Sequence, residues 1–370
     1  MGSKRAMLKN GLGEILGKEV IGRSRFVDLF SGSSSVSWFV AQQNEVSVVA
    51  VDLQLYGAVL ANAVLARTKA LIPEDLWLCW KTRAQELVMA ANAPAIVKVT
   101  QASVLAARLW ATWFPEGSLV QAYAGHYYSP LQAVWIEALR TTIPIDEPHH
   151  SVCLAALIIA ASRSAAAPGH TAQPFQPTKT AKQFLESSWQ RDVPALVLAA
   201  LQDLTKRHAQ SVGFGIRQDA NTYAAELKPG DLVFVDPPYS GVHYSRFYHV
   251  LECIAEGETT VVSGVGRYPA PSKRPRSDYS MKTTSSDAMK DLLRTLANRG
   301  TDVILTFPDH ECSNGLSGEK IVEIAADYFT VDKHAVKSVF STLGGVTGEI
   351  PGTRKARQNA SELILILRSK

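Results

Sequence analysis

The chain has 370 residues, of which 46% are hydrophobic, and a formal net charge of +4. This length and composition predict a globular protein with a large core, built as one elaborated domain or as two. The four cysteines show no CxxC pair and no metal-ligand spacing, which predicts reduced thiols and no bound metal. The most hydrophobic window, at 152–162, is too short to span a bilayer, so we expect a cytoplasmic protein without a membrane segment.

The first predicted elements are two strands joined by a helix. "RFVDLF" (25–30) is a short apolar run that ends in a Gly/Ser turn, and "VSWFVAQQ" has helical character. "VSVVAVD" (46–52) is a second β-branched run that ends in an acid. Parallel strands joined in this way form a right-handed crossover, with the ligand at the carboxyl ends of the strands. We therefore expect an α/β, Rossmann-like sheet with helices on both faces.

A long helical segment then interrupts the β-rich pattern. Residues 67 to about 210 are rich in Ala and Leu and carry few strand signals. Buried strands are predicted again at 231–236, 301–307 and 361–368. The sequence therefore predicts a sheet domain made from 1–66 and 211–370, and a mostly helical insertion at 67–210.

Two polar loops are rich in proline, at 165–184 and 262–286. The second concentrates basic side chains with two tyrosines among its prolines. One interpretation is a solvated, mobile connection. The other is a strap that contacts phosphates, because clustered Lys and Arg are what binding to a nucleic-acid backbone requires.

The loop after the first strand, "DLFSGSSSV" (28–36), favours a bound nucleoside. Its small residues let the backbone pass close to a ligand, and the next helix offers unpaired N–H groups, although a simple tight turn is the alternative. Asp52 ends the second strand, where a carboxylate can accept bonds from both ribose hydroxyls or, alternatively, cap a helix. The sequence lacks a P-loop and a GxGxxG after a strand, so a nucleoside cofactor without phosphate fits better.

The segment "VFVDPPYSGVHYSRFY" (233–248) carries the candidate chemistry. Its strand delivers Asp236 to the carboxyl edge of the sheet, two prolines stiffen the turn, and Tyr239 presents a flat ring. The Asp236 carboxylate and the Pro237 carbonyl could each accept one N–H of an exocyclic amine, while the ring stacks on the base. The alternative is a strand end followed by an ordinary turn.

This constellation resembles the S-adenosylmethionine-dependent DNA adenine-N6 methyltransferases, in the class with the cofactor motif first, the target-recognition region next and the catalytic motif last. "DPPY" is one of that family's most specific signatures. The residues that the resemblance implies to be catalytic are Asp236, Pro237, Pro238 and Tyr239. Family members use S-adenosylmethionine as their cofactor and no metal, and the insertion at 67–210 would be the target-recognition region.

The resemblance also assigns residues to the cofactor. "GSKRAML" (2–8) resembles the N-terminal motif, with Lys4 near the methionine end of the cofactor. "DLFSGSSSV" resembles the FxGxG loop, with Phe30 and Gly32 matching and Ser34 in place of the second glycine. Asp219 resembles the acid that binds the adenine amino group of the cofactor. The implied cofactor-binding set is Lys4, Asp28, Phe30, Gly32, Asp52 and Asp219.

The implied substrate is double-stranded DNA with the target base flipped out of the helix, because an adenine amine cannot be reached inside a duplex. The residues expected to contact DNA are Tyr244, Arg246, Lys273, Arg274 and Arg276. Such enzymes serve restriction-modification or epigenetic systems. The sequence leaves open the target site, a cognate restriction endonuclease, and a monomer or a dimer.

Three other activities and one non-catalytic role remain as alternatives. An RNA adenine-N6 methyltransferase would need the same acceptors around its amine. A protein-glutamine enzyme usually carries Asn-Pro-Pro-Tyr, and a cytosine-N4 enzyme Ser at the first position of the motif, so Asp236 argues against both. A non-catalytic nucleic-acid-binding module on the same fold would not need an intact Asp236 and Tyr239.

Overall fold

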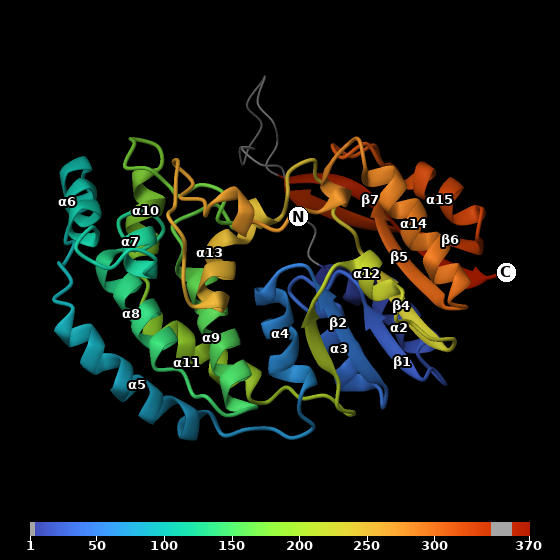
Figure 1. Cartoon of the computed structure of the whole chain (residues 1–370), viewed down its shortest axis with the longest axis horizontal. Coiled ribbons are helices and arrows are strands. Elements are labelled where there is room, and N and C mark those ends of the chain that lie inside the picture. The colour runs from blue at the N-terminus through green and yellow to red at the C-terminus, as the bar shows by residue number, and fades with distance from the viewer. Residues whose placement is uncertain (1–3, 342–356) are drawn as a thin grey trace.

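The computed structural model describes residues 4–341 and 357–370, and within these ranges the strands form one seven-stranded sheet in the order β3-β2-β1-β4-β5-β7-β6 (Figure 1). Strands β1 to β5 are parallel, whereas β7 runs antiparallel to both β5 and β6. The strands are β1 Arg25–Asp28, β2 Ser47–Asp52, β3 Phe214–Arg217, β4 Asp231–Val235, β5 Asp302–Pro308, β6 Phe329–Ser341 and β7 Arg357–Ser369. Residues 2 and 3 of the N-terminal motif lie outside the described residues.

Successive residues of the central strands point to opposite faces of the sheet, and each face carries its own core. On one face Val27, Val233 and Val303 pack under helices. These helices are α12 Ala220–Ala224, α14 Ser285–Asn298 and α15 Gly318–Ala326. On the other face Phe26 and Leu232 pack under the helices at the start of the chain. Those are α1 Lys4–Met7, the π-helical turn Leu8–Leu12, α2 Gly13–Glu19 and α3 Ser35–Gln43. The predicted α/β, Rossmann-like sheet with helices on both faces is confirmed.

A helical half lies beside the sheet (Figure 1). Its elements are α5 Pro73–Ala90, α6 Gln101–Ala111, α7 Leu119–Tyr123, α8 Pro130–Thr141, α9 His149–Ser164, α10 Lys182–Trp189 and α11 Val193–Leu204. Two helices from outside this stretch share its core, namely α4 Leu55–Leu65 and α13 Ser245–Glu256. Because α4 also packs on the sheet, it joins the two halves.

Two strands have no counterpart among the strands predicted from the sequence. The edge strand β3 has only four residues, "FGIR", and each is at least partly exposed, so it lacks the apolar run that marks a buried strand. The edge strand β6 mixes charged and apolar residues, with Asp332, Lys333 and His334 exposed at its start. The composition of such edge strands does not reveal them in a sequence. They become evident only from their backbone pairing with a neighbouring strand in the structure.

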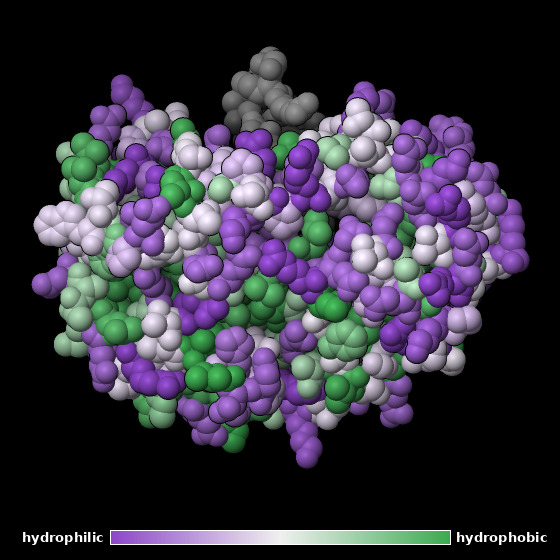
Figure 2. Space-filling model, viewed as in Figure 1, coloured by the Kyte–Doolittle hydropathy of each residue, from purple (hydrophilic) through white to green (hydrophobic). Residues whose placement is uncertain are grey.

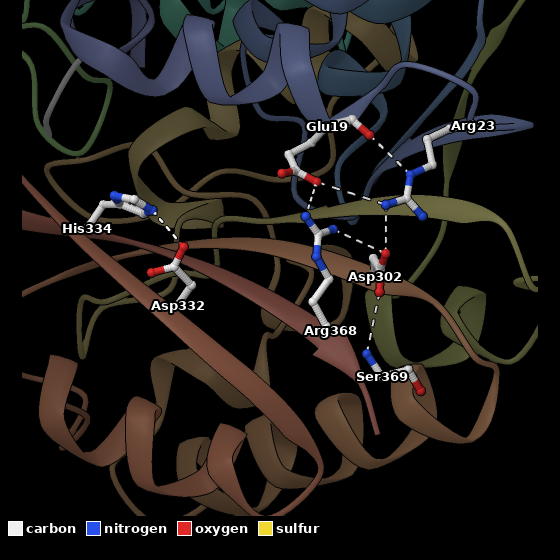
Figure 3. Close-up of polar contacts among 7 residues, drawn as sticks. All are labelled: Glu19, Arg23, Asp302, Asp332, His334, Arg368 and Ser369. Atoms are coloured by element: carbon white, nitrogen blue, oxygen red, sulfur yellow. Dashed lines mark hydrogen bonds and ion pairs between the residues drawn. The ribbon is translucent and has the colours of Figure 1, made fainter.

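An ion-pair network lies at the end of the sheet opposite the carboxyl ends of the parallel strands (Figure 3). Asp302, the first residue of β5, accepts Arg23 Nη2 at 2.6 Å and Arg368 Nη1 at 3.1 Å. Arg368 also pairs with Glu19, the last residue of α2. The network therefore ties the start of the chain to its last strand. A separate exposed pair on β6, between His334 and Asp332, appears in the same view.

The surface is mixed in character. Figure 2 shows a largely hydrophilic face with scattered hydrophobic groups, some over the helical half and some between it and the sheet. Among the described residues, no helix is long and apolar enough to cross a membrane.

Candidate active site

A cavity of about 570 Å³ lies between the carboxyl edge of the sheet and the helical half. Each residue predicted to bind the cofactor contributes to its wall: Lys4, Asp28, Phe30, Gly32, Asp52 and Asp219. The predicted catalytic turn, Asp236, Pro237, Pro238 and Tyr239, lines it as well. Residues of α9 and α11, among them Ile159 and Asp203, form the opposite wall. Segments that are distant in sequence therefore meet around one space of the size that small-molecule sites occupy.

Four carboxylates stand in a row along this edge because four neighbouring strands end there. Asp28 and Asp52 are the last residues of β1 and β2. Asp219 and Asp236 follow the ends of β3 and β4. The strand order β3-β2-β1-β4 places β1 at the point where the connections change direction, and ligands of such sheets bind in the crevice at that point.

Asp52 holds the loop that follows β1. Its Oδ2 accepts the N–H of Gly32 at 2.7 Å, and its Oδ1 accepts the N–H of Gln54 at 2.8 Å. Burial raises the pKa of this carboxyl to about 6, against the lowering effect of the two backbone bonds. Each carboxylate oxygen has a second lone pair, so both can still accept a ligand hydroxyl.

Asp28 is buried behind the same loop. Its Oδ2 accepts the hydroxyl of Ser37 at 2.6 Å, and its Oδ1 accepts the N–H of Phe30 at 3.3 Å. Burial is the main cause that raises its pKa to about 7, and the nearby carboxylates Asp236 and Asp52 add to it. The side chain therefore braces the loop as well as lining the cavity.

Ser34 stands where the FxGxG pattern has its second glycine, and its backbone conformation is one that glycine favours. It immediately precedes α3 with a φ of 57° and a ψ of 20°, which is the left-handed conformation. Glycine adopts this conformation without strain, whereas a residue with a Cβ does so at a cost on the order of 1 kcal/mol. The backbone at this position thus has the shape that the second glycine of the FxGxG pattern would favour.

Asp219 differs from the other three acids because it is exposed. Its Oδ1 accepts the N–H of Thr222 at 3.0 Å and thereby caps α12. Close by, the ring of Phe30 meets the buried ring of Tyr279 edge to face, with centroids 5.1 Å apart. Both rings line the cavity, so this part of the wall is aromatic with an acid at its rim.

The predicted catalytic turn is fixed at two points. Asp236 Oδ1 receives Lys4 Nζ and Thr306 Oγ1, each at 2.9 Å. The amide of buried Asn314 donates to the carbonyl of Pro238 at 3.0 Å. Its second donation, at 2.9 Å, goes to the carbonyl of Tyr279, so Asn314 joins the turn to the loop 262–286. Asn314 thus braces the turn from the loop that follows β5.

The predicted DNA-contacting residues divide into two groups. Tyr244 lines the cavity, whereas the four cations Arg246, Lys273, Arg274 and Arg276 do not. The guanidinium carbons of Arg246 and Arg274 lie 4.9 Å and 5.6 Å from the ring centroid of Tyr268. Arg276 and Lys273 are exposed.

The two proline-rich loops pack against each other. The hydroxyl of Tyr268, in the loop 262–286, donates to the carbonyl of Ala172, in the loop 165–184. The hydroxyl of buried Tyr127 lies within hydrogen-bond distance of the carbonyls of Thr171 and Gly266, one in each loop, and its single hydrogen is shared between them. The loop 262–286 is therefore anchored to the helical half through residues 263–268.

Sequence reasoning missed two polar residues of the cavity. Ser31 Oγ and Gln54 Nε2 are buried and have no hydrogen-bond partner among the described residues. Both residues line the cavity. Buried polar groups nearly always have a partner, so these atoms are expected to bind a ligand or ordered water. A Ser and a Gln in loops carry no pattern that would have marked them in the sequence.

No family model matches the chain. Modification methylase StsI of Streptococcus sanguinis is 29% identical over 132 residues, which are 36% of this chain and 19% of that protein. Modification methylase LlaI of Lactococcus lactis subsp. lactis is 25% identical over 308 residues, which are 80% of this chain and 44% of that protein. The chain thus spans less than half the length of each of these two relatives, and it is similar to modification methylases over most of its own length.

Proposed function

We propose that the chain is an S-adenosylmethionine-dependent DNA methyltransferase that modifies the N6 amino group of adenine. The observation that carries this proposal is the convergence of the Asp-Pro-Pro-Tyr turn and the nucleoside-type acids on one cavity. The similarity to two proteins named modification methylases supports a methyl-transfer reaction on DNA. The choice of adenine depends on the residues of the turn.

The walls of the cavity fit the cofactor. Asp52 retains a free lone pair on each oxygen for the two ribose hydroxyls. The unpartnered Ser31 Oγ and Gln54 Nε2 supply further polar contacts. Asp219, at the exposed rim beside Phe30 and Tyr279, is placed to accept the amino group of the adenine of the cofactor. When bound, S-adenosylmethionine supplies a methyl group on a positively charged sulfur.

The catalytic turn fits the acceptor amine. Because Lys4 and Thr306 both bond Oδ1 of Asp236, Oδ2 remains to accept one N–H of the target amine. Asn314 occupies the carbonyl of Pro238, which leaves the carbonyl of Pro237 for the other N–H. Holding both hydrogens favours the pyramidal amine, whose lone pair can then attack the methyl group in line. The surplus proton leaves to solvent once the amine is methylated.

The target base must leave the duplex to reach this turn. Tyr239 and Tyr244 line the same cavity, so their rings are positioned to stack on a flipped base. The four predicted cations do not line the cavity, and we expect them to contact the phosphates on either side of the flipped base: Arg246, Lys273, Arg274 and Arg276. We also propose, from the family resemblance, that the helical half recognises the target DNA sequence.

The proposal is tested by product identification. Purified protein is incubated with labelled S-adenosylmethionine and either plasmid DNA or RNA, and the products are digested to nucleosides and separated by mass spectrometry. We expect label in N6-methyladenine from DNA. Label in N4-methylcytosine would refute the base assignment, and label confined to RNA would refute the substrate assignment.

A further inference from the structure

Glu362, which sequence reasoning did not single out, belongs to the charge arrangement around the catalytic turn. It lies on β7, opposite Pro308 of β5, and is only 7% exposed. Its carboxylate pairs with Lys4 Nζ, the same ammonium that lies 2.9 Å from Asp236 Oδ1. Lys4 therefore bridges one carboxylate on β7 and one directly after β4.

The two carboxylates stabilise the charged form of Lys4. Burial alone would lower the pKa of Lys4, but the charges of Asp236 and Glu362 and their hydrogen bonds outweigh burial and raise it to about 12. Lys4 thus stays charged at neutral pH. Other titratable groups near Asp236 are Asp28, at the end of β1, and Tyr244, just before α13, and neither can supply a positive charge.

The geometry also fixes which oxygen of Asp236 is available. Lys4 and Thr306 approach Oδ1, and Thr306 is fully buried on β5. Two donors on one oxygen stop the carboxylate from rotating and leave Oδ2 turned away from both. A third donor on Oδ1 would meet no free lone pair.

We propose that Lys4 and Glu362 are positioning residues: Glu362 holds Lys4 against Oδ1 of Asp236, and Lys4 balances the charge of Asp236 and keeps its Oδ2 directed at the substrate amine. This role deepens the proposed methyl transfer and rests on it. It differs from the contact with the methionine end of the cofactor that the family resemblance implies for Lys4.

Charge removal distinguishes the two roles. In Lys4→Met, the carboxylates of Asp236 and Glu362 face one another in a buried site without a counter-ion, so one of them retains a proton. A protonated Asp236 cannot accept the amine at that oxygen, and methyl transfer falls. Adding Glu362→Gln removes the competing charge, so Asp236 ionises again. A lost cofactor contact would gain nothing from the second substitution.

The experiment is a double-variant cycle of methyl transfer to DNA at saturating cofactor. Lys4→Met should lower the rate at pH 7 on the order of 100-fold. Its rate should rise with pH through neutrality while that of the parent stays level. The double variant Lys4→Met/Glu362→Gln should regain at least about 10-fold of the loss at pH 7, which corresponds to roughly 1.4 kcal/mol. Lys9→Met, in the same N-terminal segment with an exposed side chain, should match the parent.

Two outcomes would overturn the inference. One is a double variant no faster than Lys4→Met; the other is a Lys4→Met whose defect lies wholly in cofactor affinity, measured by calorimetry. A thermal cycle tests the ion pairs without any activity: Lys4→Met should melt lower than the parent at pH 7, and Glu362→Gln should restore part of that loss. Equal melting of the single and double variants would contradict the charge arrangement. A parent that methylates no DNA would instead defeat the proposed function, and the thermal cycle would still decide whether the charges are coupled.

Discussion

The carboxylate of Asp52 packs directly against the backbone of Gly57, in the first turn of α4. A Cβ at Gly57 would lie 2.7 Å from Cγ of Asp52 and 3.0 Å from its Oδ2. The same Oδ2 accepts the N–H of Gly32. The absence of a side chain at Gly57 therefore allows the proposed ribose-binding acid to reach the loop after β1.

Gly57→Ala should weaken the binding of S-adenosylmethionine about tenfold, or roughly 1.4 kcal/mol, because the new methyl group displaces Asp52 from Gly32. Isothermal titration calorimetry measures the change. The matched control is Gly17→Ala in α2, where a Cβ would meet nothing within 4 Å. That variant should bind the cofactor like the parent, and an unchanged affinity in Gly57→Ala would argue against Asp52 as a ribose ligand.

Asp28 gives the fold a pH-dependent weakness. Burial raises its pKa from 3.8 to about 7, so the folded protein holds this proton more tightly than the unfolded chain does. The free energy of unfolding therefore falls as the pH rises from about 4 to 7, because Asp28 loses its proton in the folded protein. Above about pH 7 the whole cost of the buried charge is present. Asp28→Asn should raise the free energy of unfolding at pH 8 by about 2 kcal/mol and leave it unchanged near pH 4.

Denaturant unfolding at the two pH values checks the Asp28 prediction. In the variant, the amide can still accept from Phe30 and donate to Ser37, whose hydroxyl turns. Asp327→Asn, at an exposed carboxylate after α15, serves as the control and should show no difference at either pH. A variant that is less stable than the parent at pH 8 would contradict the assignment.

The network around Asp302 should contribute measurably to stability. Asp302 forms ion pairs with Arg23 and Arg368, and its side chain is only 20% exposed. Solvent therefore screens these pairs less than it screens pairs at the open surface. Asp302→Asn should cost about 1–2 kcal/mol of unfolding free energy. Asp291→Asn breaks a pair whose side chains are both 56% exposed, and should cost less than about 0.5 kcal/mol. Equal losses in the two variants would show that the network adds nothing beyond a surface pair.

Arg246 should act on DNA through a phosphate. It is exposed and held 4.9 Å above the ring of Tyr268, so its remaining donors face solvent. Arg246→Ala should weaken DNA binding about equally for target and non-target sequences, and should reduce the slope of log K against log salt by about 1. Arg294→Ala, on α14, is the control. A loss confined to the target sequence would make Arg246 a base-reading residue instead.

The sequence was informative where short motifs carry the chemistry. The acids at the ends of β1, β2 and β4 are each preceded by a clear apolar run, so their positions at one sheet edge could be predicted. The role of Glu362 could not be predicted, because it directly precedes a long apolar run. A single acid at that position is typical of a strand end. Its pairing with Lys4 depends on contacts between the two ends of the chain.

The bracing of the site also depends on such long-range contacts. Asn314 reaches the predicted catalytic turn only because β5 lies beside β4 in the sheet. Gly57 acts through the absence of a side chain, which leaves no chemical signal in a sequence. The unpartnered Ser31 and Gln54 become evident only once burial is known.

The central claim is that Asp236 orients an adenine amine in DNA for methyl transfer. The most direct measurement compares the parent and Asp236→Ala in single-turnover methylation of DNA by cofactor-saturated enzyme, with cofactor affinity measured alongside. The account predicts a rate lower by about 1,000-fold in the variant, with N6-methyladenine as the product of the parent and cofactor binding retained in both. Equal rates in the two proteins would contradict it.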